Sequence, residues 1–321
     1  MCTSFEPGHL EEALASITDP DAHAIAVAEA HLYCAREAQA VEAARPYLNH
    51  DDPALRYSAC LISGYANLSL NHIAEARIAL HALLAPVDPS EPDVVKAAHI
   101  LMGASASVLL HLPAPFAVEE FYPLVANLPE GLRLFASYVL AHAFYLHGEY
   151  GRCTGAALNA LIMRQGSYPV SELFLHLVAS MGYMSLKEVD RARWHFETAW
   201  SIARPDDMIE PIGMHHGLLQ GLIEVCLKGL EPAEFSRVIE ITYRFSHGWR
   251  LIHNPASGED VADDLTTTEF TVSMLACRGW SNAEIAKHLG ISPGTVKNRL
   301  SSTYVKLGIS SRAELKARML K

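Results

Sequence analysis

Residues 265–315 read LTTTEFTVSMLACRGWSNAEIAKHLGISPGTVKNRLSSTYVKLGISSRAEL, and local signals in this stretch predict four short helices. Three helix starts carry a serine or threonine followed three residues later by glutamate, at Thr266/Glu269, Ser281/Glu284 and Ser311/Glu314. This spacing is typical of the capping box, in which each side chain bonds the backbone N–H of the other residue. Ser292 before Pro293 marks the remaining start, because proline loses no hydrogen bond in a first turn. Gly279, Gly290 and Gly308 predict the intervening helix ends.

The second and third of these helices form a closely connected pair. Residues 282–289 and 293–307 are separated only by Gly290-Ile291-Ser292, which is the pattern of a helix-turn-helix. The second helix of such a pair lies in the major groove of DNA. Its apolar side is predicted to pack inward, through Val296, Leu300, Thr303 and Leu307. Its other side offers groups suited to base edges and phosphates: Asn298, Ser301 and Ser302, flanked by Lys297, Arg299 and Lys306.

The whole stretch resembles the LuxR/FixJ-type helix-turn-helix. The matching residues are Leu265-Thr266, Glu269, Gly279, Ser281, Glu284-Ile285-Ala286, Leu289, Ile291-Ser292, Thr295-Val296-Lys297, Lys306-Leu307-Gly308 and Ser311-Arg312-Ala313-Glu314-Leu315. Thr268 and Arg299 depart from the family, which usually has arginine at the first position and often histidine at the second. The resemblance covers about the last sixth of the chain. It implies that Lys297, Asn298 and Ser301 face bases, and that Thr295, Ser302 and Lys306 face phosphates.

This stretch has two other interpretations. The run ISPGTVKNRL also resembles the promoter-reading region of sigma factors. A sigma factor needs a further module for the melted strand, and the first two hundred residues contain no aromatic-rich basic helix that could serve. The four helices could also cap a helical array without touching DNA. The ending KLGISSRAEL favours the LuxR type over the sigma factor.

Charge is distributed unevenly along the chain. Of its 25 Lys and Arg and 36 Asp and Glu, nine and three lie from Leu265 onward, which gives that part a net charge of +6. The remaining 16 basic and 33 acidic residues give the preceding part −17. A basic terminal module on an acidic body is expected when only the module contacts phosphate.

The body is predicted to be helical throughout, so the fold class expected is all-α. Small or apolar residues recur at i, i+3, i+7 and i+10 in four segments, which we call combs and which begin at Ile73, Val118, Tyr150 and Val189. The intervals between the combs vary more than the ~34-residue repeat of a tetratricopeptide unit. Residues 141–150 and 184–200 resemble that unit more closely. We expect a tetratricopeptide-like helical solenoid at 1–250, a linker at 251–264 and the LuxR-type module at 265–321. An irregular helical bundle is the alternative for the body, and a last body helix is expected from Pro232 to Phe245.

A solenoid offers a concave groove in which an effector could bind. Aromatic and imidazole side chains are suited to such capture, and the candidates are Tyr145, Tyr168, His176, Tyr183 and Trp194. The same residues at helical spacing also fit a structural core. The adjacent His215 and His216 have no carboxylate or cysteine at metal spacing, so we expect a loop facing solvent or the groove rather than a metal site.

Several functional classes lack support. The six cysteines show no C-x-x-C spacing and are expected to be buried thiols of a cytoplasmic protein. The N-terminus lacks the pattern of a signal peptide, and the uncharged run 97–112 is short for a membrane span. No nucleotide loop, nucleophile elbow or zinc-protease helix occurs, so neither an enzyme nor a cofactor is predicted. The chain looks like a MalT-type regulator without the ATPase.

The sequence therefore favours a bacterial one-component transcription regulator of the LuxR type. Its expected partners are double-stranded promoter DNA, RNA polymerase, a second copy of the chain, and a small-molecule or protein effector. Switching could come from the body masking residues 293–307. The alternative function is a helical-repeat interaction scaffold whose C-terminal helices dock a partner.

Overall fold

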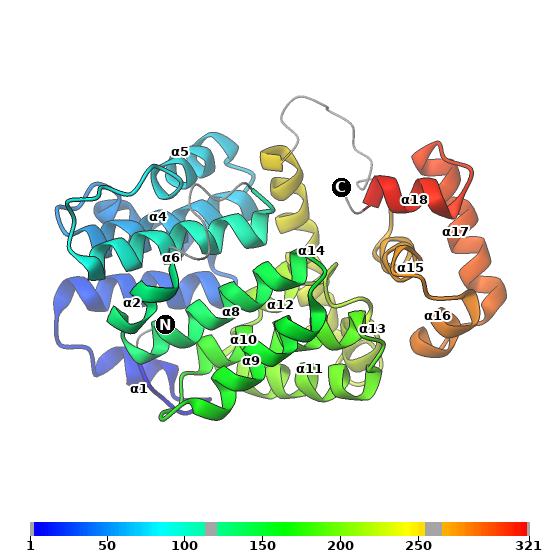
Figure 1. Cartoon of the computed structure of the whole chain (residues 1–321), viewed down its shortest axis with the longest axis horizontal. Coiled ribbons are helices and arrows are strands. Elements are labelled where there is room, and N and C mark those ends of the chain that lie inside the picture. The colour runs from blue at the N-terminus through cyan, green and yellow to red at the C-terminus, as the bar shows by residue number, and fades with distance from the viewer. Residues whose placement is uncertain (1–2, 113–120, 254–264, 320–321) are drawn as a thin grey trace.

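The computed structural model of the chain describes residues 3–112, 121–253 and 265–319, which contain helices and no strand. The all-α prediction is therefore confirmed. In chain order the α-helices are α1 Leu10–Ala15, α2 Pro20–Tyr33, α3 Glu37–Ala44, α4 Pro53–Ser69, α5 Ile73–Leu83, α6 Asp93–Leu110, α8 Glu130–Leu146, α9 Tyr150–Met163, α10 Pro169–Ser185, α11 Val189–Ala203, α12 Glu210–Met214, α13 Leu222–Leu227, α14 Pro232–His253, α15 Thr267–Cys277, α16 Asn282–Leu289, α17 Pro293–Leu307 and α18 Arg312–Met319. Figure 1 shows α15 to α18 grouped at one end of the molecule, beside the body.

Four helix pairs in the described part of the body, α2–α3, α4–α5, α8–α9 and α10–α11, are joined by turns of one geometry, and α6 ends in the same kind of turn. Each turn holds a residue in the left-handed conformation, with φ between 54° and 77°, at Ala35, Asn71, His111, Gly148 and Lys187. The next residue donates its N–H to the carbonyl five positions back, over 2.8–2.9 Å. This hydrogen bond helps to end the helix, because it gives a partner to a carbonyl that would otherwise lack one. Steps of 36, 40, 37 and 39 residues separate the five turns, so the body repeats.

The predicted combs mark the second helices of these pairs. Ile73, Tyr150 and Val189 are the first residues of α5, α9 and α11. The comb that opens at Val118 begins outside the described residues. The first helices pack in sequence, because α2 contacts α4, α4 contacts α6, α6 contacts α8 and α8 contacts α10.

The array of pairs curls around the segment that follows it. The short helix α12 contacts α2 near one end of the array and α10 near the other, while α14 contacts α4, α5 and α6. In Figure 1, α12 and α14 lie between the α4–α6 region and the α8–α11 region. The chain itself therefore fills the space in which an effector groove was expected.

Hydrogen bonds join the array to this central segment. The hydroxyl of Tyr138 on α8 lies 3.0 Å from His215 Nε2, and Ser69 on α4 donates to Glu210 over 3.0 Å. Burial lowers the pKa of His215 to about 4, so this ring is neutral. His216 is also buried, and its Nε2 lies 2.8 Å from Glu224. We expected these two histidines in a loop facing solvent or the groove; the solvent-facing alternative is wrong, because both rings are buried inside the array.

The described residues contain no group of metal-ligating side chains.

Helix α6 is the one described helix that is long and apolar enough to cross a membrane. The greater part of this helix is buried, and it contacts α4, α5 and α8. It is therefore a core helix of the body. Five cysteines are free and buried, namely Cys34, Cys60, Cys153, Cys226 and Cys277, and burial raises the pKa of each thiol. Cys2 lies outside the described residues.

The boundary between body and C-terminal group differs from the prediction. Helix α14 continues past Phe245 to His253, so residues 251–253 belong to a helix. The rest of the predicted linker, 254–264, lies outside the described residues. The continuation is stabilised by close packing, because Gly248 presents no side chain where α14 crosses α4. A Cβ at this position would collide with the carbonyl oxygen of Leu68.

Candidate nucleic-acid interface

Helices α16 and α17 form the predicted helix-turn-helix, and local capping sets their ends. Ser281 accepts from the N–H of Glu284, and the Glu284 carboxylate accepts from the N–H of Ser281, which completes a capping box. Gly290 ends α16 with φ of 65°. Ser292 then starts α17 by accepting the N–H of Thr295 over 3.0 Å, with Pro293 in the first turn. The predicted bounds of both helices are confirmed.

The inner side of α17 holds it against α15 and α16. Val296, Leu300, Thr303 and Leu307 are buried, as the spacing predicted. Thr303 receives a hydrogen bond of 3.3 Å from Ser273 on α15, so the polar member of this side has a partner. Burial of one side fixes the rotation of the helix and therefore determines which residues face outward.

The outer side of α17 is open to solvent. Lys297, Asn298, Arg299 and Ser301 are exposed. Asn298 and Ser301 lie three residues apart and share one side of the helix. Thr295 is half-buried, and its hydroxyl bonds that of Ser292 over 2.9 Å at the start of the helix. The amide of Asn298 and the hydroxyl of Ser301 therefore lie on the helix surface between the two cations, Lys297 and Arg299.

The remaining two predicted site residues bond an acidic side chain of the same module. Ser302 donates to Glu269 Oε1 over 2.7 Å, and Lys306 Nζ lies 2.7 Å from Glu269 Oε2. The same carboxylate accepts the backbone N–H of Thr266 as part of the α15 capping box. Glu269 therefore ties the start of α15 to the last turns of α17.

These contacts determine the charge state of Glu269. Burial alone would raise the pKa of its carboxyl, but the bonds from Lys306, Ser302 and Thr266 outweigh that effect and lower the pKa to about 2. The side chain is therefore ionised at neutral pH. A phosphate oxygen approaching Ser302 or Lys306 would compete with this carboxylate for the same hydrogen atoms.

Two features of the interface were not predicted. Val305 is 82% exposed and points from the same outer side as Asn298 and Ser301. Sequence reasoning identified Glu269 as a capping residue and gave no sign of its bonds to Ser302 and Lys306. The helical positions of α17 could have indicated Val305, because it lies opposite the buried side.

Among the described residues, the body leaves the outer side of α17 exposed, so the expected masking of residues 293–307 is not observed there. The body instead contacts α15 and α16. For example, α13 packs on α16, and Lys187 just before α11 forms an ion pair of 3.1 Å with Glu284. Figure 1 shows α15 between α17 and the body.

The five residues proposed for an effector groove occupy three separate places. His176, Tyr183 and Trp194 surround His195 between α10 and α11, with 2.9 Å between the Nδ1 atoms of the two histidines. Burial lowers the pKa of His176 to about 3 and that of His195 to about 4, so both rings are neutral. Tyr145 is buried and accepts a hydrogen bond of 2.8 Å from Arg278 of the C-terminal module. Tyr168 bonds Glu130 over 3.4 Å.

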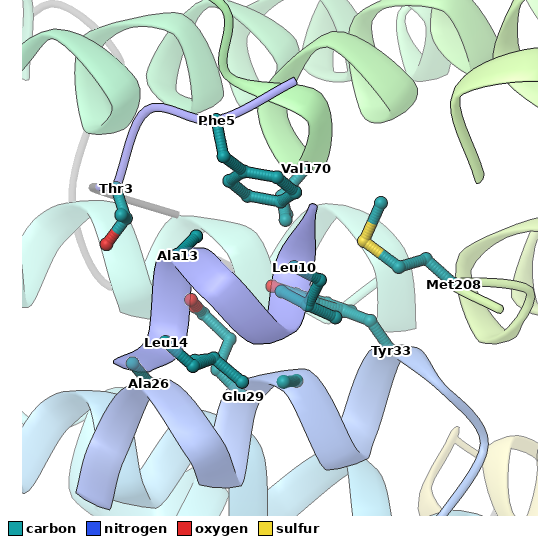
Figure 2. Close-up of a pocket in the computed structure, with 11 residues that line it drawn as sticks. Thr3, Phe5, Leu10, Ala13, Leu14, Ala26, Glu29, Tyr33, Val170 and Met208 are labelled. Atoms are coloured by element: carbon teal, nitrogen blue, oxygen red, sulfur yellow. The ribbon is translucent and has the colours of Figure 1, made fainter. Parts of the chain in front are cut away.

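A hollow in the body lies elsewhere, beneath the N-terminal segment. Figure 2 shows Phe5 and Val170 above it, Leu10, Leu14 and Ala13 along it, and Tyr33 and Glu29 on its far side. The segment that covers it is fixed at both ends, because Phe5 donates to the Ser167 carbonyl over 3.0 Å and Leu10 donates to Asp206 over 3.0 Å. None of the five predicted groove residues lines this hollow.

Comparison with known proteins identifies the C-terminal module. Residues 263–319 match the model of the family described as bacterial regulatory proteins, LuxR family. The C-terminal part of the chain is therefore a LuxR-type helix-turn-helix domain, as the resemblance implied.

The similar curated proteins match over stretches no longer than this module. Two proteins named as helix-turn-helix-type transcriptional regulators, from Mycobacterium bovis and Mycobacterium tuberculosis, are 49% identical over 51 residues, which is 16% of this chain and 6% of each relative. The transcriptional regulatory protein SgaR of Hyphomicrobium methylovorum is 43% identical over 54 residues, which is 17% of this chain and 26% of that protein. The matched region thus spans about a quarter or less of these relatives. No solved structure matches the chain.

Proposed function

We propose that the chain is a one-component transcription regulator that binds double-stranded promoter DNA through α17. The observation that carries the proposal is the open outer side of this helix. Lys297, Asn298, Arg299 and Ser301 are exposed on a helix whose other side is buried, within a module of the LuxR type. In this arrangement Lys297, Asn298 and Ser301 contact bases, and Thr295, Ser302 and Lys306 contact phosphates.

The acidic body supports a division of labour. A net charge of −17 before Leu265 disfavours contact between the body and DNA, whereas the terminal +6 favours it. The relatives named as transcriptional regulators match over only 51 and 54 residues, about the length of the module, so they support the DNA-binding role alone. We infer a cytoplasmic protein without enzymatic activity that acts on RNA polymerase at promoters.

The body supports the sensing role through its repeated construction. Helix pairs at intervals of 36–40 residues are close to the ~34 residues of a tetratricopeptide unit, and arrays of such pairs bind partners. Since α12 and α14 occupy the inside of the array, an effector must bind elsewhere on the body or displace this segment.

The test is selection of DNA by the full-length chain. Duplexes enriched from a random-sequence pool are used in mobility-shift titrations with wild type, with Lys297→Ala/Asn298→Ala, and with Arg45→Ala. Arg45 is an exposed body residue paired with Glu42, so it controls for loss of a positive charge. We expect wild type and Arg45→Ala to prefer the selected duplex, and the double variant to lose at least tenfold in affinity. A pool without an enriched motif would contradict DNA reading and favour the scaffold function.

A further inference from the structure

The contact between the body and the DNA-binding module contains a half-buried arginine that lies beside two neighbouring tyrosine rings. Arg278 at the end of α15 lies 5.0 Å from the ring centre of Tyr145 and 5.5 Å from that of Tyr150. Its guanidinium donates to both tyrosine hydroxyls, over 2.8 Å in the case of Tyr145. A cation stacked on aromatic faces and bonded at its edge has both its position and its plane fixed.

Two glycines of the body lie where side chains of the module pack closely against the body backbone, and we call this place the seat of the module. A Cβ on Gly217 would lie 2.8 Å from the ring of Phe270, and a Cβ on Gly221 would lie 2.7 Å from Leu289. The backbone of Gly221 also has φ of 91°, which only glycine adopts without strain. A Cβ at either position would have to displace the end of a side chain of the module.

Polar contacts on either side of the seat set the rotation of the module. His288 on α16 donates to the Gln220 carbonyl over 3.1 Å, and Thr271 on α15 donates to Glu224 over 3.1 Å. The ion pair between Lys187 and Glu284 closes the outer edge. With Arg278, these bonds reach the module from α8, α9, α10, α13 and the loops around them, so the module is held at several separate points.

Several buried polar atoms at this contact have no hydrogen-bond partner among the described residues. These five atoms are Gln220 Oε1, Glu224 Oε2, Arg278 Nε, Trp280 Nε1 and His288 Nδ1. Unpaired buried groups destabilise a contact. Loss of one anchor is therefore expected to release the module without unfolding either part.

We propose that this contact is a dock that fixes the direction of the DNA-reading side of α17 relative to the body. Docking leaves that side open and places the body against α15 and α16, so docking determines orientation and does not block DNA. The proposal rests on the DNA-binding function proposed above. It assigns Arg278, Gly217 and Gly221 as positioning residues.

The test measures where the body lies on bound DNA. Asp190 is exposed three residues after Lys187, which contacts α16, and the first helix of a helix-turn-helix crosses the DNA backbone. An iron–EDTA group is attached to the full-length chain through Asp190→Cys, with Cys2→Ser in every variant. The other five thiols are buried and have raised pKa, so they react poorly. Hydroxyl-radical cleavage of the selected duplex reports the position of the probe.

Wild type is expected to cut one short run of nucleotides beside the bound site. Arg278→Ala and Gly217→Ala are expected to bind the duplex within threefold of wild type and to spread the cuts or lose them. Arg45→Ala and Gly151→Ala are the controls and should keep the short run, because Arg45 lies away from the dock and a Cβ on Gly151 meets nothing within 4 Å. Helical circular dichroism and melting verify that each variant is folded.

Two outcomes would overturn the dock. In the first, wild type binds the duplex but cuts it diffusely or leaves it uncut. In the second, both dock variants are folded and cut like wild type. Failure of the proposed function gives a different result, because the random-sequence pool would then yield no enriched duplex for wild type or any variant to bind.

Discussion

At the scale of single residues, Glu269 combines two tasks that sequence patterns treat separately. Its carboxylate closes the capping box of α15 with Thr266 and also holds Ser302 and Lys306 of α17. The capping contact spans three residues and can be predicted locally. The contacts to α17 span 33 and 37 residues, so only the packing of α15 on α17 creates them.

The low pKa of Glu269 leads to a pH-dependent stability. Because its folded pKa is about 2 and a free glutamate titrates near ~4.3, the carboxylate stabilises the fold above about pH 4.3. This contribution declines as pH falls through the range between these two values. Glu269→Gln is therefore expected to melt below wild type at pH 7, with a difference that shrinks from about pH 4.5 toward pH 3. Thermal unfolding followed by circular dichroism measures it.

Glu75→Gln is the matched control for that measurement. Glu75 is exposed on α5 and far along the chain from the DNA-binding module, and the change removes the same charge. Its melting temperature should follow that of wild type at each pH. A Glu269→Gln deficit that stays constant from pH 7 to pH 3 would show that the ionised carboxylate is not the stabilising species.

At the scale of elements, the ends of α16 and α17 could be predicted to the residue because their signals are local. Ser281, Gly290, Ser292 and Gly308 each act within a few positions of the chain. The end of α14 could not be predicted in this way. Ser246, His247 and Gly248 resemble a helix end, yet the helix continues because Gly248 packs on the backbone of α4.

Alanine substitutions at two glycines near the turn are expected to change the free energy of unfolding in opposite directions. Gly290 has φ of 65°, and a Cβ there would meet nothing within 4 Å, so Gly290→Ala brings only backbone strain, of ~1 kcal/mol. Gly294 lies within α17 with ordinary helical backbone, so Gly294→Ala is expected to stabilise the helix by roughly 0.5–1 kcal/mol. Urea unfolding of both variants gives the comparison. Equal signs for the two changes would contradict the assignment of Gly290 as a left-handed cap.

At the scale of the whole molecule, the sequence predicted the helical body and its pairs but not what the array encloses. The apolar combs at Ile73, Tyr150 and Val189 depend on local spacing, and they lie on α5, α9 and α11. The packing of α12 between α2 and α10, and the bond from Tyr138 to His215, join residues far apart in the chain. The expected groove residues were chosen by side-chain type, and most of them became core or dock residues because position in the array decides burial.

The proposed pairing of two copies on DNA predicts the size of the protected site. One four-helix module buries too little surface for tight recognition, so two modules are expected to occupy two inverted half-sites. Hydroxyl-radical footprinting of the selected duplex with full-length chain should show two protected segments about one helical turn apart, or a multiple of it. A single protected segment at saturating protein would contradict pairing, while leaving the role of α17 intact.

The most direct measurement of the central claim is the affinity of Asn298→Ala and Lys306→Ala for single-base variants of the selected duplex. Asn298 is expected to distinguish one base by ~1–3 kcal/mol, or about 5- to 150-fold, and Asn298→Ala should lose that distinction at one position. Lys306→Ala should weaken binding to every duplex alike and reduce the salt slope by about one. If Asn298→Ala discriminates between bases as wild type does, the exposed side of α17 does not read the sequence.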